Sequence, residues 1–300
     1  TIMNKVKSFK PLRFFLLALT AFVYSLSIQS QYSVDQKTKI FDANGVSIAY
    51  TVAGEENSTP VLMVMGLMAS HKLWGEKIVN DLVDAGYKVI LFDNRDTGDS
   101  ERLDRLGEPN LWWKYFLSTV GISFSTPYTL SDMANDGIAV LDELGIESAH
   151  LVGASMGGMI VQTMAFENPS RAKSLVSIMS TTGAKHLSGM SEEMEGDFEG
   201  VEDLDVEETH KYGFYPEAMP RQLTAIFHAG DRSDQVSKIK VRTLVQHGLD
   251  DPLLPSDHGI HTAELIKGSE IKLYEGMAHN LPDEVIPLVI SDMINFFQEG

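Results

Sequence analysis

The run Leu151-Val-Gly-Ala-Ser-Met-Gly-Gly-Met159 joins an apolar strand pattern, a serine between two glycines and the start of a helical pattern. In a G-x-S-x-G sequence of this kind the chain turns sharply from strand to helix, with the serine at the apex. Ser155 would then have a strained backbone, which is tolerated because the flanking glycines carry no side chain. The free N–H groups of the helix N-terminus would favour a negative charge beside Ser155. A glycine-rich turn with an incidental serine has the same pattern, so the rest of the chain must decide.

Eight apolar or β-branched runs are predicted as strands, including the one that ends at this turn. They cover residues 39–42, 46–52, 60–65, 88–92, 149–152, 174–179, 241–247 and 270–274. Helical patterns alternate with these strands. One begins directly after Ser155, and the others cover residues 74–85, 131–144, 221–229, 258–266 and 284–297. The alternation predicts an α/β fold with a mostly parallel, eight-stranded sheet flanked by helices. The turn Ala43-Asn-Gly45 predicts that the first two strands form a hairpin.

Two local features are less regular. Residues 101–128 are expected to form a loop in which Trp112, Trp113 and Phe116 anchor the segment by packing inward. Ser131 is expected to cap the helix that follows, because a serine hydroxyl can accept a hydrogen bond from a free helical N–H group.

The composition excludes several classes of partner and chemistry. The 300 residues carry a formal net charge of −18, which argues against nucleic acid and anionic membrane surfaces as partners. The absence of cysteine excludes disulfides, thiol catalysis and thiolate metal sites. No dinucleotide-binding G-x-G-x-x-G is present, and the acidic residues miss the register of a calcium loop. We therefore predict neither a cofactor nor a metal.

Residues 1–30 differ from the rest of the chain. Four basic residues precede an apolar run at residues 14–24, and small and polar residues follow at 25–30. This order is typical of a secretory signal peptide, and the apolar run is shorter than the ~20 residues of a membrane span. We expect residues 1–30 to direct export to the periplasm or the medium, after which no stable membrane partner remains. The alternative is an uncleaved N-terminal anchor that holds the protein on the membrane.

The remaining chain divides into a core interrupted by an insertion. We expect residues 31–182 to form the first part of the core, 183–237 a short cap insertion, and 238–300 the second part. Within the insertion, residues 192–208 include seven Glu and three Asp. So dense a run of like charge is interpreted as a solvated or mobile lid segment.

Three polar residues follow three different predicted strands. Ser155, Asp251 and His279 each come shortly after a strand, and the carboxyl ends of parallel strands share one edge of a sheet. A serine hydroxyl needs a base to accept its proton, and the base needs a carboxylate to orient it. The chain order Ser, Asp, His is one of the known orders of such a triad. The spacing therefore predicts a nucleophile, an acid and a base that meet at one edge.

Other polar residues near strand ends are interpreted as structural. Asp93, Arg95 and Asp96 are expected to form ion pairs that brace a loop. His247 ends a strand beside Asp251 and is interpreted as structural.

The chain resembles the α/β-hydrolase-fold serine esterases, and in particular the aclacinomycin methylesterase-like branch. The motifs that carry the resemblance span residues 38–300 and read Val64-Met-Gly-Leu67, Asp93-Asn-Arg-Asp-Thr-Gly-Asp-Ser100, Tyr128-Thr-Leu-Ser-Asp-Met133, Gly153-Ala-Ser-Met-Gly-Gly158, Ile178-Met-Ser-Thr-Thr-Gly183, His247-Gly-Leu-Asp-Asp-Pro252 and Gly276-Met-Ala-His-Asn-Leu-Pro282.

The resemblance implies a role for five positions. It maps the nucleophile to Ser155, the acid to Asp251 and the base to His279. The backbone N–H groups of Met156 and Leu67 map to the oxyanion hole. The register Gly248-x-x-Asp251-Pro252 favours Asp251 over its neighbour Asp250.

Two departures from the family pattern bear on function. Relatives commonly carry His-Gly where this chain has Met65-Gly66, a change that a backbone donor should tolerate. The insertion is also shorter than the usual cap, so substrate identity is not carried over.

Together these features predict a serine carboxylesterase that acts on a small-molecule ester with a short-to-medium acyl or methyl group. Alternatives on the same triad are a cofactor-free haloperoxidase or perhydrolase and a carbon–carbon bond hydrolase. The non-enzyme alternative is a ligand-binding protein on a hydrolase scaffold. Four methionines near the turn and the oxyanion strand are expected either to form apolar pocket walls or to belong to the core: Met65, Met68, Met156 and Met159.

Overall fold

A computed structural model describes residues 38–189 and 206–299. Eight strands form one sheet in the order β1-β2-β4-β3-β5-β6-β7-β8. The strands are β1 (Lys39–Ala43), β2 (Val46–Ala53), β3 (Thr59–Val64), β4 (Tyr87–Phe92), β5 (Ala149–Ala154), β6 (Ala172–Ile178), β7 (Thr243–Gly248) and β8 (Glu270–Tyr274). Only the pairs β1–β2 and β2–β4 are antiparallel. The predicted mostly parallel eight-stranded sheet is therefore confirmed.

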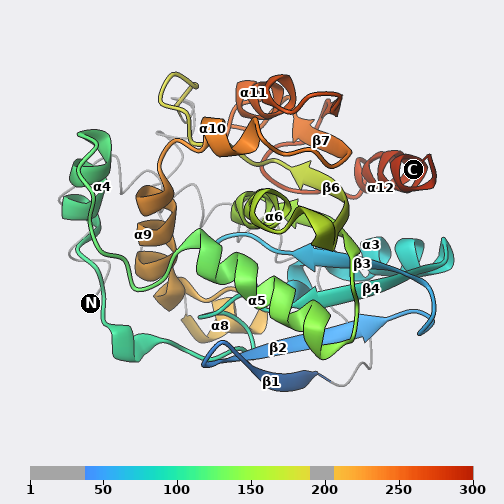
Figure 1. The fold of residues 1–300 in the computed structure, drawn as a ribbon, viewed down its shortest axis with the longest axis horizontal. Coiled ribbons are helices and arrows are strands. Elements are labelled where there is room, and N and C mark those ends of the chain that lie inside the picture. The colour runs from blue at the N-terminus through green and yellow to red at the C-terminus, as the bar shows by residue number, and fades with distance from the viewer. Residues whose placement is uncertain (1–37, 190–205, 300) are drawn as a thin grey trace.

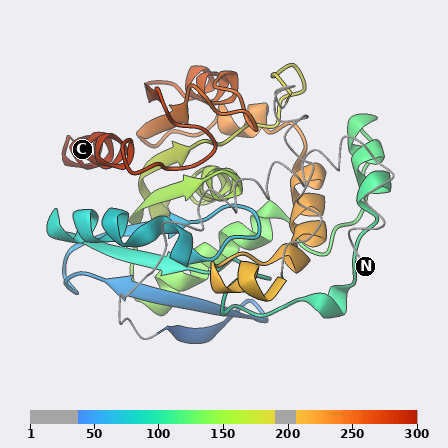
Figure 2. The same ribbon diagram turned by 180° about the vertical axis from the view of Figure 1, so that it is seen from behind.

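Helices cover both faces of the sheet (Figure 1). They are α3 (Gly75–Asp84), α4 (Leu111–Thr119), α5 (Leu130–Glu143), α6 (Met156–Glu167), α8 (Val206–Lys211), α9 (Met219–Ala229), α10 (Ser233–Val236), α11 (Asp257–Leu265) and α12 (Ile286–Gln298). One apolar core forms between the sheet and α3 and α12, and a second between the sheet and α5 and α6. Figure 2 shows α3 on the face opposite α5 and α6.

The hairpin of β1 and β2 also forms as predicted. Asn44 and Gly45 both have positive φ angles, of 57° and 81°. These angles suit a two-residue turn whose twist matches that of the strands, which is why an Asn-Gly pair is favoured there.

The loop prediction for residues 101–128 was wrong in part, because α4 lies within it. The side chain of Asn110 caps this helix by accepting a hydrogen bond from the N–H of Trp113. Trp112, Trp113 and Phe116 are 46%, 48% and 41% exposed and stack on one another. They are not inward anchors. Six of the nine residues of α4 are apolar or aromatic, and they occur around most of the helix, so the sequence shows no helical periodicity that separates a buried face from an exposed one.

The predicted cap of α5 is also displaced. Thr129 accepts a hydrogen bond from the N–H of Asp132, and the Asp132 carboxylate accepts one from the N–H of Thr129. This reciprocal capping box satisfies two free N–H groups at once. Ser131 lies inside the helix and donates to Glu167 Oε2 at 2.6 Å.

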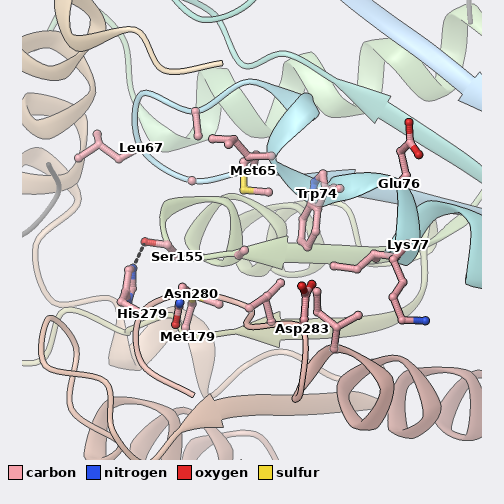
Figure 3. A pocket seen from close by; sticks show the side chains of 18 of the residues that line it. Met65, Leu67, Trp74, Glu76, Lys77, Ser155, Met179, His279, Asn280 and Asp283 are labelled. Atoms are coloured by element: carbon pink, nitrogen blue, oxygen red, sulfur yellow. Dashed lines mark hydrogen bonds between the residues drawn. The ribbon is translucent and has the colours of Figure 1, made fainter. Parts of the chain in front are cut away.

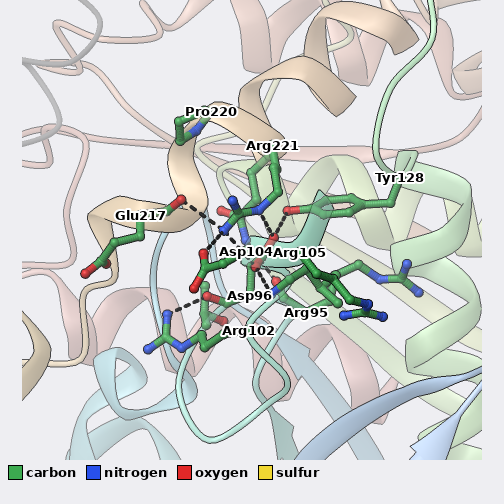
Figure 4. A network of polar contacts seen from close by, with 12 residues as sticks. Arg95, Asp96, Arg102, Asp104, Arg105, Tyr128, Glu217, Pro220 and Arg221 are labelled. Atoms are coloured by element: carbon green, nitrogen blue, oxygen red, sulfur yellow. Dashed lines mark hydrogen bonds and ion pairs between the residues drawn. The ribbon is translucent and has the colours of Figure 1, made fainter. Parts of the chain in front are cut away.

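Buried ion pairs brace the loop that follows β4, as predicted (Figure 4). Arg95 Nε and Nη2 donate to the two oxygens of Asp136, at 2.7 and 2.6 Å. Asp96 receives two bonds from Arg221 of α9, at 2.8 and 3.0 Å, and one from the hydroxyl of Tyr128. These contacts join three elements distant in the sequence: the β4 loop, α5 and α9.

Several predictions concern residues outside the described part of the chain. The proposed signal peptide, residues 1–30, lies wholly outside it, and so does most of the acidic run 192–208. Export, the lid role and the boundaries of core and cap therefore stay predictions. Among the described residues, no helix is both long enough and apolar enough to cross a bilayer.

A buried histidine in β5 links stability to pH. His150 packs against the rings of Tyr87 and Phe297, and its Nδ1 is 2.7 Å from Ser174 Oγ. Burial lowers the pKa of His150 from 6.5 to about 4, and the charges of Lys173 and Arg242 act in the same direction. The unfolded chain therefore binds a proton at this position more readily than the folded chain does, so acid favours unfolding.

We expect the free energy of unfolding to fall by about 2 kcal/mol between pH 7 and pH 5 because of His150 alone. Urea denaturation of wild type and His150→Gln at the two pH values measures this contribution. The pH-dependent loss should be smaller by that amount in the variant, whatever its absolute stability. Equal losses in the two proteins would contradict the assignment.

Candidate active site

The three predicted polar residues lie together at one edge of the sheet (Figure 3). Ser155 follows β5, Asp251 follows β7 and His279 follows β8, and these parallel strands are joined through β6. His279 Nε2 is 2.9 Å from Ser155 Oγ, and His279 Nδ1 is 2.7 Å from Asp251 Oδ2. Such a chain of hydrogen bonds can move a proton from the hydroxyl to the imidazole and fix the imidazole tautomer.

The backbone at Ser155 is strained, as the glycine pattern predicts. Its φ is 55° and its ψ is −121°, a conformation that residues with a side chain rarely adopt. A Cβ at Gly153 would overlap the carbonyl oxygen of Gly157, and a Cβ at Gly157 would overlap that of Val64. Glycine is required at both positions because backbone lies against them. The turn thus presents the hydroxyl at the end of β5.

Asp251 rather than Asp250 contacts the imidazole. Asp251 Oδ1 accepts hydrogen bonds from the N–H groups of Leu253 and Leu254, at 3.0 and 2.9 Å. Asp250 is exposed, and its Oδ2 accepts from the N–H of Gly276 at 2.7 Å. The two carboxylates therefore have different partners despite their adjacent positions.

The surroundings of Asp251 keep it ionised. Burial alone would raise the pKa of Asp251, but the charge of His279 and hydrogen bonds from His247, His279 and the Leu254 backbone hold it well below its usual range. His247 is fully buried, and its Nε2 lies 2.7 Å from Leu254 O and 3.5 Å from Asp251 Oδ2. This buried placement agrees with the structural role predicted for His247.

The loop after β3 lies directly beside Ser155. A Cβ at Gly66 would stand 3.1 Å from the Cβ of Ser155 and 3.6 Å from its Oγ, so the loop passes close to the serine and leaves little room for a side chain at position 66. Among the hydrogen bonds of the described residues, none is donated by the N–H of Leu67 or of Met156. An amide N–H that has no acceptor within the protein can donate to a negatively charged oxygen. Two such amides near a serine hydroxyl can therefore bind an oxyanion.

A cavity of about 380 Å³ opens beside Ser155 and His279. Apolar side chains form much of its wall, among them Met65, Leu73, Met179, Leu281 and Ile286. Glu76, Lys77 and Asp283 also line it, on the side away from Ser155 (Figure 3).

Of the four methionines considered from the sequence, only Met65 is among the residues that line this cavity. Met68, Met156 and Met159 are buried in the apolar core instead. Met179 of the cavity wall was not anticipated. Residues 38–189 and 206–299 contain no group of three or more His, Asp or Glu side chains that could hold a metal ion.

Comparison with known proteins identifies the fold to which this geometry belongs. Residues 59–207 match the alpha/beta hydrolase fold family. The chain has the alpha/beta hydrolase fold. An esterase from Rhodococcus sp. ECU1013 superposes with a TM-score of 0.66 at 21% identity, covering 88% of this chain and 99% of the esterase.

The curated proteins that are similar to this chain are named for more than one reaction. Rhodomycin D methylesterase from Streptomyces peucetius is 26% identical, over 82% of this chain and 93% of the relative. This similarity confirms the resemblance to the aclacinomycin methylesterase-like branch. A 2-hydroxy-6-oxo-6-phenylhexa-2,4-dienoate hydrolase from Comamonas testosteroni is also 26% identical, over 79% of this chain and 86% of the relative.

The glycine requirement at the Ser155 turn is testable. Gly153→Ala should lower the free energy of unfolding by at least about 2 kcal/mol, because the new methyl group meets both backbone and Val161. Gly189→Ala is the matched control: no atom lies within 4 Å of the added group, and the change should stay within about 0.5 kcal/mol. Urea denaturation measures both. Similar stability of the two variants would show that the turn can relax.

Proposed function

We propose that this α/β hydrolase is a serine carboxylesterase. The observation that carries the proposal is the continuous chain of hydrogen bonds from Ser155 through His279 to Asp251 beside an open cavity. The ionised Asp251 stabilises the imidazolium that forms when His279 accepts a proton. The methylesterase and esterase relatives support the same class of reaction.

The reaction proceeds in two steps. Ser155 Oγ attacks the ester carbonyl while His279 accepts the hydroxyl proton, and the N–H groups of Leu67 and Met156 bind the resulting oxyanion. His279 then protonates the leaving alcohol, and an acyl group remains on Ser155. Water attacks this acyl-enzyme with His279 as base, releasing the acid and restoring the serine.

The cavity favours uncharged esters of moderate size. Its apolar walls suit a short-to-medium acyl group or a methyl ester, and a volume of about 380 Å³ is at the small end of ligand sites. The formal charge of −18 disfavours the approach of anionic esters.

A p-nitrophenyl ester series from acetate to decanoate tests the proposal. We expect wild type to hydrolyse the shorter members and Ser155→Ala to lose at least about 10⁴-fold in kcat, since the nucleophile is gone. A fluorophosphonate probe should label wild type and not the variant. Ester hydrolysis independent of Ser155 would remove the esterase assignment, and cleavage of a vinylogous 1,5-diketone without ester hydrolysis would indicate carbon–carbon bond hydrolysis.

The adjacent carboxylates supply a matched pair of variants. Asp251→Asn should lower kcat by about 10³- to 10⁴-fold, because an amide cannot stabilise the imidazolium and favours the wrong tautomer. Asp250→Asn should change kcat by less than about threefold, since Asp250 is exposed and its carboxylate accepts a hydrogen bond from the backbone of Gly276, not from His279. Steady-state kinetics on the best ester decides. A larger loss in Asp250→Asn would reverse the assignment.

A further inference from the structure

The loop that bears the Leu67 N–H is held by a side-chain amide on each side. Asn94 Nδ2 donates to the carbonyl oxygen of Met65 at 2.8 Å. Gln222 Oε1 accepts from the N–H of Met68 at 2.7 Å. The peptide that carries the Leu67 N–H therefore lies between two anchored peptides. Asn94 comes from the loop after β4, whereas Gln222 comes from α9 and lies 154 residues after Met68 in the chain.

The loop needs such anchors because its backbone is not in a relaxed state. Met68 has a φ of 61°, in the left-handed region that is unfavourable for a residue with a side chain. Its carbonyl oxygen is also engaged, by the N–H of Tyr215 at 2.8 Å. Both polar groups of the Met68 backbone thus bond to the segment between β6 and β7, and these bonds hold Met68 in its strained conformation.

Gln222 is itself fixed in one orientation. It is fully buried, and its Nε2 donates to the carbonyl oxygen of Arg95 at 3.3 Å. Its neighbour Arg221 makes the two-bond ion pair with Asp96 that ties α9 to the β4 loop (Figure 4). The amide oxygen must face Met68, because the backbone nitrogen there can only donate. A buried acceptor held in this way needs no reorganisation during a reaction.

We propose that Gln222 is a positioning residue, which keeps the N–H of Leu67 directed at the developing oxyanion by holding the adjacent Met68 amide. The inference rests on the proposed esterase function. Gln222 does not touch the reacting atoms, so its contribution is the pre-set geometry of the donor. That contribution is realised chiefly in the transition state, where the negative charge is largest, and it therefore affects kcat more than KM.

Gln222→Met tests this role, because methionine has a similar length and no strong acceptor for the Met68 N–H. We expect kcat to fall about 10- to 100-fold, which is less than the loss of a whole oxyanion donor, with KM changed by less than about threefold. The affinity of an alkyl boronic acid should fall by a similar factor to kcat/KM. Its tetrahedral adduct with Ser155 places an oxygen where the oxyanion forms.

Thr224→Val is the matched control on the same helix. Thr224 is fully buried, and its hydroxyl donates only to Pro220 O within the α9 region, so its loss loosens the helix without touching the Met68 amide. We expect kcat and boronate affinity of Thr224→Val within about threefold of wild type. If Gln222→Met does not fold, Gln222→Asn replaces it, since its shorter side chain withdraws the acceptor and should give the same losses.

The outcomes separate the two proposals. Unchanged kcat and boronate affinity in an active Gln222 variant would overturn the inference and leave the esterase function standing. Equal losses in Thr224→Val would overturn it too, because they would indicate a general loosening of α9. A wild type that hydrolyses no ester and binds no boronate would overturn the esterase function, and this inference with it.

Discussion

The close approach of the Ser155 turn to β3 is the constraint on which the active-site geometry depends. The carbonyl oxygen of Val64 lies so near Gly157 that position 157 has no space for a side chain. This contact sets the end of β3, and with it the loop at Gly66 and Leu67, against the start of α6. The strained serine and the backbone amides beside it are consequences of one packing arrangement between two neighbouring parallel strands.

Asp251 and His279 are positioned by the opposite half of the sheet. β7 and β8 deliver Asp251 and His279, and a second tight contact fixes their loops, because a Cβ at Gly248 would overlap the carbonyl of Met277. The site therefore has rigid backbone on both sides of the hydroxyl. Its polar groups need no flexible loop to bring them within hydrogen-bond distance of one another.

Much of this arrangement could be predicted from the sequence because its signals are local. A strand followed by glycine, serine and glycine specifies the turn around Ser155, and an Asn-Gly pair specifies the first hairpin. Parallel strands then bring Ser155, Asp251 and His279 to one edge, whatever the length of chain between them. The choice of Asp251 over Asp250 came from motif register, and the hydrogen bond to His279 agrees with it.

The features that were missed depend on contacts between distant segments. Neither Gln222 nor Met68 carries a local pattern that relates it to the other, since their hydrogen bond joins the loop after β3 to the insertion, 154 residues further along the chain. The exposed face of α4 is as aromatic as a buried helix face would be. Only the packing of α9 against α4 shows which side of α4 is covered and which side faces solvent. Thr129 and Ser131 are equally good caps by residue type, and only the reciprocal bond with Asp132 selects Thr129.

The double engagement of Met68 bears on how this enzyme scaffold can diversify. A segment inserted between two strands is usually regarded as an exchangeable module, free to be replaced when a new ligand must be accommodated. Here the module supplies the amide oxygen of Gln222 and the N–H of Tyr215 to the core. A transplanted module that lacks these two groups would leave a buried donor and a buried acceptor unsatisfied in the core. Exchange of segments is therefore confined to parts of the insertion that do not bond to Met68. Single substitutions of the residues that line the cavity beside Ser155 are the easier route to new ligands.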